Sequence, residues 1–234
     1  MNQLHYSGEP NLRGEDVSAR SEELQGVLRR RVTIPPTASG HQLVNAFMTT
    51  LRAANTVGGI AYLSQASAGP EPICFQSGDT VRTVLSKIQA LRPELVLDGA
   101  ESVINLVDSR IIKLLETRIA HASIPNPSTD WYGAKAALLA LPEVASQIRE
   151  LRIEADGQFS NLAVQEPAGQ TNAEPFILDN ITLRQALNAI AQRVMWQRNG
   201  YAMWIYTERM SAQDDRVFSL ELNFFTTARD SQHR

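Results

Sequence analysis

The sequence predicts an α+β protein built from two tandem βαββαβ modules, each a small sheet with helices packed on one face. Three observations lead to this prediction. The 234 residues suffice for two domains of about 100 residues each. Short β-prone runs alternate with stretches that carry an apolar stripe at helical spacing. One helix sequence in the first half also returns in the second half.

The first module is expected over residues 28–110. The expected elements are a short strand at 32–34, a helix over about 40–55, strands at 60–63 and 73–75, a helix between Thr80 and Pro93, and a β-hairpin within 95–107. Gly58 and Gly59 are expected to end the first of these helices. Asp98 and Gly99 are expected to form the turn of the hairpin.

The second module is expected over residues 111–226, with a long insertion near 156–174 that is rich in Gly, Gln, Asn and Pro. The expected elements are a strand at 117–124, a helix from Trp131 that Pro142 interrupts, strands at 151–155 and 174–178, a helix capped by Thr182, and strands at 201–206 and 217–225. Residues 1–27 are expected to form a loose N-terminal tail and the start of a helix, and residues 227–234 a polar tail.

The internal repeat is visible in the second helix of each half. Residues 80–88 (TVRTVLSKI) align with residues 182–190 (TLRQALNAI), and four positions are identical. The capping threonine and the apolar face coincide, and a turn and an apolar strand follow in both halves. The shared order of elements around the match favours a duplicated module.

This pattern of strand, Thr-Leu-Arg-x-Ala-Leu-x-x-Ile, turn and strand resembles the short N-terminal domain of secretins and TonB-dependent transporters. The resemblance covers residues 32–107 and, more loosely, 117–207. It implies a βαββαβ unit and a location in the bacterial cell envelope. The chain also resembles exported bacterial proteins that carry such a module twice. It departs from the secretins and transporters because it holds no barrel or secretin domain, and because of the insertion at 156–174.

The charge and hydropathy of the chain bear on its partners. The formal net charge of -3 gives no field that would attract nucleic acid. No stretch approaches the roughly 20 apolar residues of a membrane span. Residues 1–16 are polar and lack the apolar segment of a signal peptide. The resemblance to the envelope domain implies a periplasmic or exported protein, whose export signal is then not in this chain; the alternative is a cytoplasmic protein.

A search for catalytic chemistry finds no set of residues with the required spacing. The sequence contains neither CxxC nor HExxH, and no Walker loop or GxSxG elbow. We therefore expect no metal, no cofactor and no enzymatic activity. Cys74 is the only cysteine, and its apolar run predicts a buried structural thiol. The alternative is a thiol hydrolase in which Cys74, His41 and Asp79 approach one another.

The aromatic residues are the best candidates for a binding surface. Trp131 and Tyr132 open a helix, and Trp204 and Tyr206 share one face of a strand. Because both faces of that strand are apolar, core packing is the favoured interpretation, and a central strand is expected. The alternative is a partner surface formed by these four residues.

The resulting functional expectation is a non-catalytic protein-interaction module of the bacterial cell envelope, with a protein as its partner. Small sheets of this kind bind partners by adding a strand at an edge. The alternative is a soluble small-ligand-binding protein with a site between the two modules.

Overall fold

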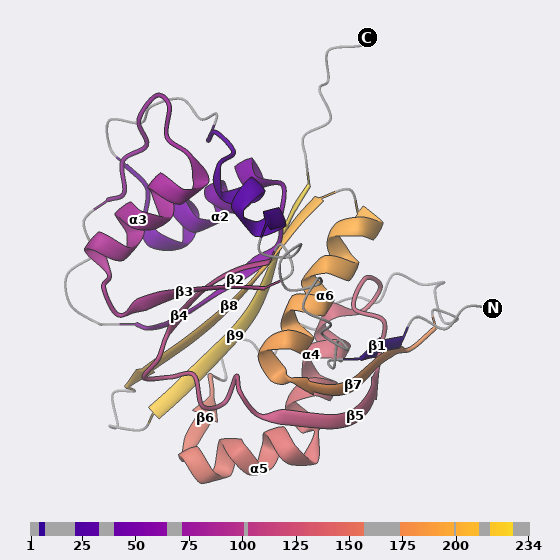
Figure 1. Cartoon of the computed structure of the whole chain (residues 1–234). Helices are drawn as coiled ribbons and strands as arrows, with labels where there is room; N and C mark the ends of the chain where they lie inside the picture. The colour runs from indigo at the N-terminus through magenta and orange to yellow at the C-terminus, as the bar shows by residue number, and fades with distance from the viewer. Residues whose placement is uncertain are drawn as a thin grey trace.

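The computed structural model describes residues 5–7, 22–32, 40–64, 72–100, 103–156, 174–198, 200–210 and 216–226. The helices are α2 (Leu43–Ala54), α3 (Val81–Leu91), α4 (Trp131–Ala140), α5 (Pro142–Leu151) and α6 (Leu183–Arg198). The strands are β1 (His5–Ser7), β2 (Gly58–Leu63), β3 (Leu95–Ala100), β4 (Val103–Asp108), β5 (Arg118–Ile124), β6 (Ile153–Ala155), β7 (Phe176–Thr182), β8 (Gly200–Met210) and β9 (Arg216–Thr226). Figure 1 shows this mixture of helices and strands, which confirms the α+β class.

Strands from both halves of the chain join in one six-stranded sheet, with the order β3-β4-β2-β8-β9-β6. The halves meet where β2 runs parallel to β8, in a register from Gly58 opposite Met203 to Leu63 opposite Glu208. The expectation of a separate small sheet for each module is therefore corrected. Each half offers an unpaired strand edge, and pairing the two edges satisfies the backbone groups of both.

The six-stranded sheet is covered on both faces (Figure 1). Helices α2 and α3 pack on one face, with an apolar core that includes Phe47, Leu85 and Ile104. Helix α6 packs on the opposite face and lies between this sheet and a three-stranded sheet of order β1-β7-β5. The helices of the two halves therefore lie on opposite faces of the shared sheet.

The same pairing pattern occurs in both halves. In the first half, β3 and β4 form an antiparallel hairpin and β4 runs parallel to β2. In the second half, β8 and β9 form an antiparallel hairpin and β9 runs parallel to β6. This agreement extends the sequence repeat to topology, while the division into two modules stays a prediction.

The two repeated helices begin on the predicted caps. The Thr80 side chain accepts a hydrogen bond from the Thr83 N–H at 3.2 Å, and the Thr182 hydroxyl accepts one from the Gln185 N–H at 3.2 Å. The Gln185 side chain in turn accepts from the Thr182 N–H at 2.8 Å, which completes a capping box. Local sequence chemistry therefore fixes both helix starts.

Two glycine predictions are wrong. Helix α2 ends on Asn55, which adopts a left-handed conformation with φ 50°, and Gly58 and Gly59 belong to β2. Asp98 and Gly99 lie within β3, paired with Asn105 and Ile104 of β4, so they do not form the hairpin turn. The physical reason at Gly59 is close approach: a Cβ atom there would lie 1.7 Å from the Trp204 ring.

Two further expectations differ from the structure. The strand expected at 73–75 is only an isolated β-bridge between Ile73 and His41. His5–Ser7 was expected to belong to a loose tail but forms β1, parallel to Ile177–Asp179 of β7. Pro142 does interrupt the predicted helix: α4 ends at Ala140 and α5 begins with this proline, whose missing N–H costs nothing at a helix start. Most of the insertion near 156–174 and the tail at 227–234 lie outside the described residues.

Candidate functional site

The four predicted aromatic residues do not form one surface. Trp204 and Tyr206 are 0% and 1% exposed, inside the core on the α6 side of β8. Trp131 is also buried in that core, and Tyr132 is exposed. Strand β8 lies between β2 and β9 with apolar residues on both faces, as the core-packing interpretation predicted. Only Tyr132 is placed to touch a partner.

The Trp204 ring fills the junction between the halves. Its indole N–H donates a hydrogen bond to Asn188 Oδ1 of α6 at 2.7 Å, which fixes the ring orientation. The backbone of Gly59 in β2 lies directly against the ring. Side chains therefore occupy this part of the junction, where the alternative of a ligand site between the modules would need space.

A buried polar group that the sequence did not reveal lies at the end of β8. The Glu208 side chain is 1% exposed, forms an ion pair with Arg216 of β9, and accepts a hydrogen bond from the Tyr206 hydroxyl at 2.6 Å. Burial and the adjacent Glu208 charge raise the pKa of Tyr206 well above its usual range. A glutamate at the end of an apolar strand is typical of a solvated residue, so its burial gave no sequence signal.

Tyr206 gives a pH-dependence that can be tested. Because the pKa of Tyr206 is raised in the folded protein, its contribution to stability is complete below the unfolded value of 10.0 and is lost as the pH rises through the folded pKa. We expect the free energy of unfolding, measured in urea, to fall between about pH 9 and about pH 11. In Tyr206→Phe this fall should be smaller, and an unchanged fall would assign it to other groups.

Cys74 is exposed, so the prediction of a buried thiol is wrong. The flanking Ile73 and Phe75 are buried, and alternation along the extended backbone turns Cys74 outward. Nearby, His41 packs edge-on against Phe75, with ring centroids 5.1 Å apart. The Asp79 carboxylate binds the Lys87 ammonium at 2.6 Å. Asp79 is therefore engaged by a lysine, whereas the thiol-hydrolase alternative requires it to orient the histidine.

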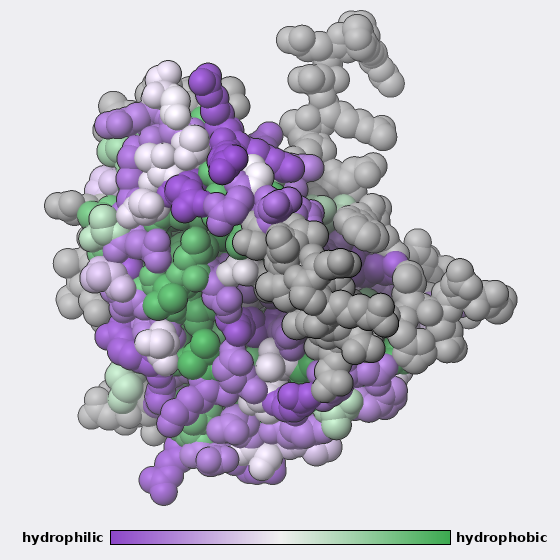
Figure 2. Space-filling model, viewed as in Figure 1, coloured by the Kyte–Doolittle hydropathy of each residue, from purple (hydrophilic) through white to green (hydrophobic). Residues whose placement is uncertain are grey.

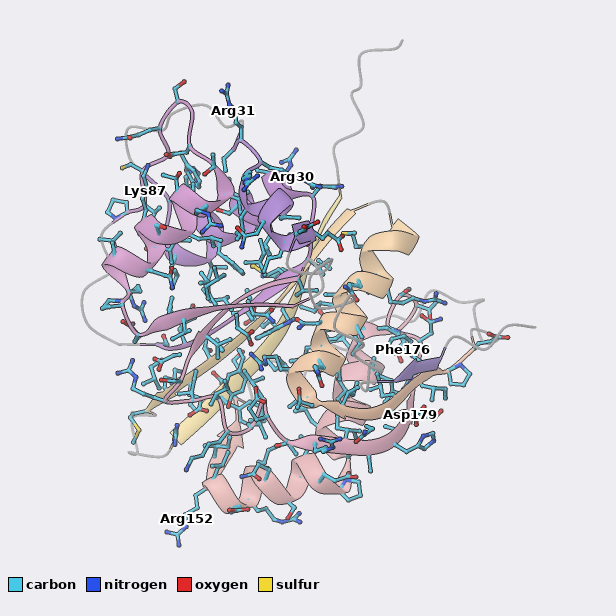
Figure 3. The ribbon with its side chains drawn as sticks, viewed as in Figure 1. Arg30, Arg31, Lys87, Arg152, Phe176 and Asp179 are labelled. Carbon is cyan, nitrogen blue, oxygen red and sulfur yellow. The ribbon has the colours of Figure 1, made fainter. Side chains whose placement is uncertain are left out.

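Polar side chains of β5 and β7 form a small cluster on the three-stranded sheet. His121 of β5 forms a close contact with Asp179 of β7, and Arg118 donates to the Asn180 side chain at 2.7 Å. Figure 3 shows Asp179 on the outer side of β7. The His121 side chain is 65% exposed.

Within the described ranges, no three His, Cys, Asp or Glu side chains come together in a way that could hold a metal ion. Among the same residues, no helix has the length and apolarity needed to cross a membrane.

The two ends of the six-stranded sheet are the remaining candidates for a binding site. Among the described strands, β3 pairs only with β4, and β6 pairs only with β9. Val96 in β3 is 55% exposed, which is unusual for a strand valine beside a core. Figure 2 shows hydrophobic residues at the surface over the region of β3 and β4, below α3. An apolar surface beside an open strand edge is a template for pairing.

Strand β3 is held in place by α6 of the other half. The Arg184 guanidinium contacts Asp98 of β3 and lies 2.8 Å from Glu116. Burial lowers the pKa of Arg184 and raises the pKa of Glu116. Arg184 belongs to the repeated helix sequence, and its counterpart Arg82 instead donates to the Gln25 side chain. The open edge is thus a strand that an ion pair connects to α6, rather than a loop.

The chain was compared with protein families, curated proteins and solved structures. No family model matches this chain, and no curated protein or solved structure is significantly similar to it.

Proposed function

We propose that this chain is a non-catalytic protein-interaction module of the bacterial cell envelope, and that it binds its partner along the open edge of β3. The observation that carries the proposal is the exposed Val96 on an edge strand whose backbone faces no other described strand. Main-chain hydrogen bonds along such an edge provide affinity, and apolar side chains beside it provide specificity. The envelope location rests on the resemblance to the secretin and TonB-dependent transporter domain.

A site-specific cross-link tests this proposal. A photo-cross-linking amino acid would replace Val96 in the full chain, and the cells would be irradiated and separated into cytosolic and envelope fractions. We expect a discrete cross-linked product in the envelope fraction, with the cross-linked peptide mapping to β3. Met210 is 60% exposed and lies away from this edge, so the same substitution at Met210 is the matched control.

Two outcomes would contradict the proposal. Equal products from positions 96 and 210 would mean that β3 has no special role. A product found only in the cytosolic fraction would remove the envelope assignment while leaving the edge as a binding site.

A further inference from the structure

The two edge strands of the six-stranded sheet, β3 and β6, occupy the same places in their halves as β8 and β2, the two strands that pair where the halves meet. Helices α2 and α5 both end on a left-handed residue, Asn55 with φ 50° and Arg152 with φ 52°, and each leads into the strand that runs parallel to the hairpin of its own half. Figure 3 shows Arg152 at this end of α5. Strand β2 thus corresponds to β6, and β3 to β8. Inside the chain β2 pairs with β8, whereas β6 and β3 are the edges left open among the described strands.

The strand registers extend this correspondence to single residues. The equivalent pairs, followed from β2 through β4 to β3 in the first half and from β6 through β9 to β8 in the second half, are Gly58 and Ala155, Ile104 and Phe218, and Gly99 and Glu208. Val96 is therefore the counterpart of Ile205. The burial of the neighbouring positions agrees, because Leu95 and Trp204 are also equivalent and each is buried against the helices of its own half.

Val96 is an apolar, exposed residue whose counterpart in the other half is buried at the junction. Its counterpart Ile205 lies opposite Ile60 in the β2–β8 pairing and is only 7% exposed. Val96 has no such strand opposite it among the described residues and is 55% exposed. A strand equivalent to β2, added beside β3, would cover it as β2 covers Ile205.

Strand β6 offers a matching donor edge. The Asp156 N–H donates to the Phe218 carbonyl of β9 at 2.7 Å. Because successive N–H groups in a strand point to opposite sides, the Ala155 N–H points toward the open edge. Ala155 is exposed. A proline at this position would remove the outward donor and spare the bond to β9.

From this equivalence we infer that the chain binds a second copy of itself head to tail, with β6 of one copy running parallel to β3 of the next. The contact repeats the β2–β8 junction, and the helices turn to the opposite face at each step, as they do between the two halves. The inference rests on the proposed function and names the partner of the same edge. Because the two surfaces differ, the contact is heterologous and continues beyond a dimer unless a ring closes.

Sedimentation velocity on the full chain tests the inference. We expect the weight-average sedimentation coefficient to rise as the protein concentration is raised from about 1 to about 100 μM, the range in which weak contacts become populated. Val96→Lys places a charge on the acceptor edge, and Ala155→Pro removes the donor on the other edge. Each variant alone should weaken association at least about tenfold, since charged residues and proline protect strand edges. Met210→Lys, at another exposed site, should associate as the unchanged chain does.

A mixture of the two edge variants tests whether β6 of one copy binds β3 of another. Val96→Lys keeps an intact β6 edge and Ala155→Pro keeps an intact β3 edge, so the mixture should form heterodimers and nothing larger. A chain that stays monomeric over the whole concentration range would overturn the inference, and so would association that neither variant weakens. If the chain is monomeric while position 96 still cross-links to a different protein, the proposed function stands and only self-association fails.

Discussion

Gly59→Ala is expected to lower the free energy of unfolding by at least about 3 kcal/mol, above the usual cost of overpacking a core. A Cβ atom on Gly59 would lie 1.7 Å from one atom of the Trp204 ring and 2.1 Å from two others. The ring cannot withdraw, because it is fully buried and its N–H is bound to Asn188. The added methyl group therefore has to push β2 away from β8, which disrupts the parallel pairing of the halves.

Urea unfolding followed by circular dichroism and tryptophan fluorescence measures this effect. Gly26→Ala is the control. Gly26 lies in a short helical segment over residues 22–28, and a Cβ atom there meets nothing within 4 Å, so alanine should stabilise the protein by roughly 0.5–1 kcal/mol. A loss below about 1 kcal/mol for Gly59→Ala would show that β2 and β8 separate easily. The double variant Gly59→Ala/Trp204→Ala should cost less than the sum of the single variants, because the clash and the ring are removed together.

Glu208→Ala is expected to lower the free energy of unfolding by about 2 kcal/mol, the usual cost of leaving a buried donor without its acceptor. Glu208 is 1% exposed, and its removal leaves the Tyr206 hydroxyl buried without its acceptor. Arg216, which is 38% exposed, loses its carboxylate partner but keeps access to water. The larger part of the cost is therefore expected from Tyr206.

Two comparisons separate the contributions at Glu208. Glu208→Gln keeps an oxygen for the Tyr206 hydroxyl, so it should cost less than half as much as Glu208→Ala. Glu154→Ala, at an exposed glutamate of β6, should change stability by less than about 0.5 kcal/mol. Equal losses for Glu208→Ala and Glu208→Gln would mean that the charge opposite Arg216, and not the tyrosine hydrogen bond, carries the stability.

The sequence predicted the elements whose causes are local. The capping threonines Thr80 and Thr182, the break at Pro142 and the central strand around Trp204 follow from side-chain chemistry within a few residues. The pairing of β2 with β8 could not be predicted in this way, because any apolar strand edge accepts many partners and tertiary packing selects one.

The candidate site shows the same division. The apolar character of Val96 is visible in the sequence, but its exposure depends on β3 being the last strand of the sheet. Gly59 looked like a helix terminator because glycine pairs are common there, and only the neighbouring Trp204 ring explains its presence in β2. Cys74 shares an apolar run with Ile73 and Phe75, and the alternation of the chain alone decides that it faces water.

The β2–β8 junction also has a consequence for the folding rate. It joins residues that are far apart in the chain, as the pairing of Gly58 with Met203 shows. Closing so long a loop costs entropy before any contact repays it, so the shared sheet is expected to form late and slowly. Helix α6 packs on strands of both halves, so neither half completes its core alone. During synthesis the first half must therefore wait, with its β2 edge unpaired, until β8 has emerged.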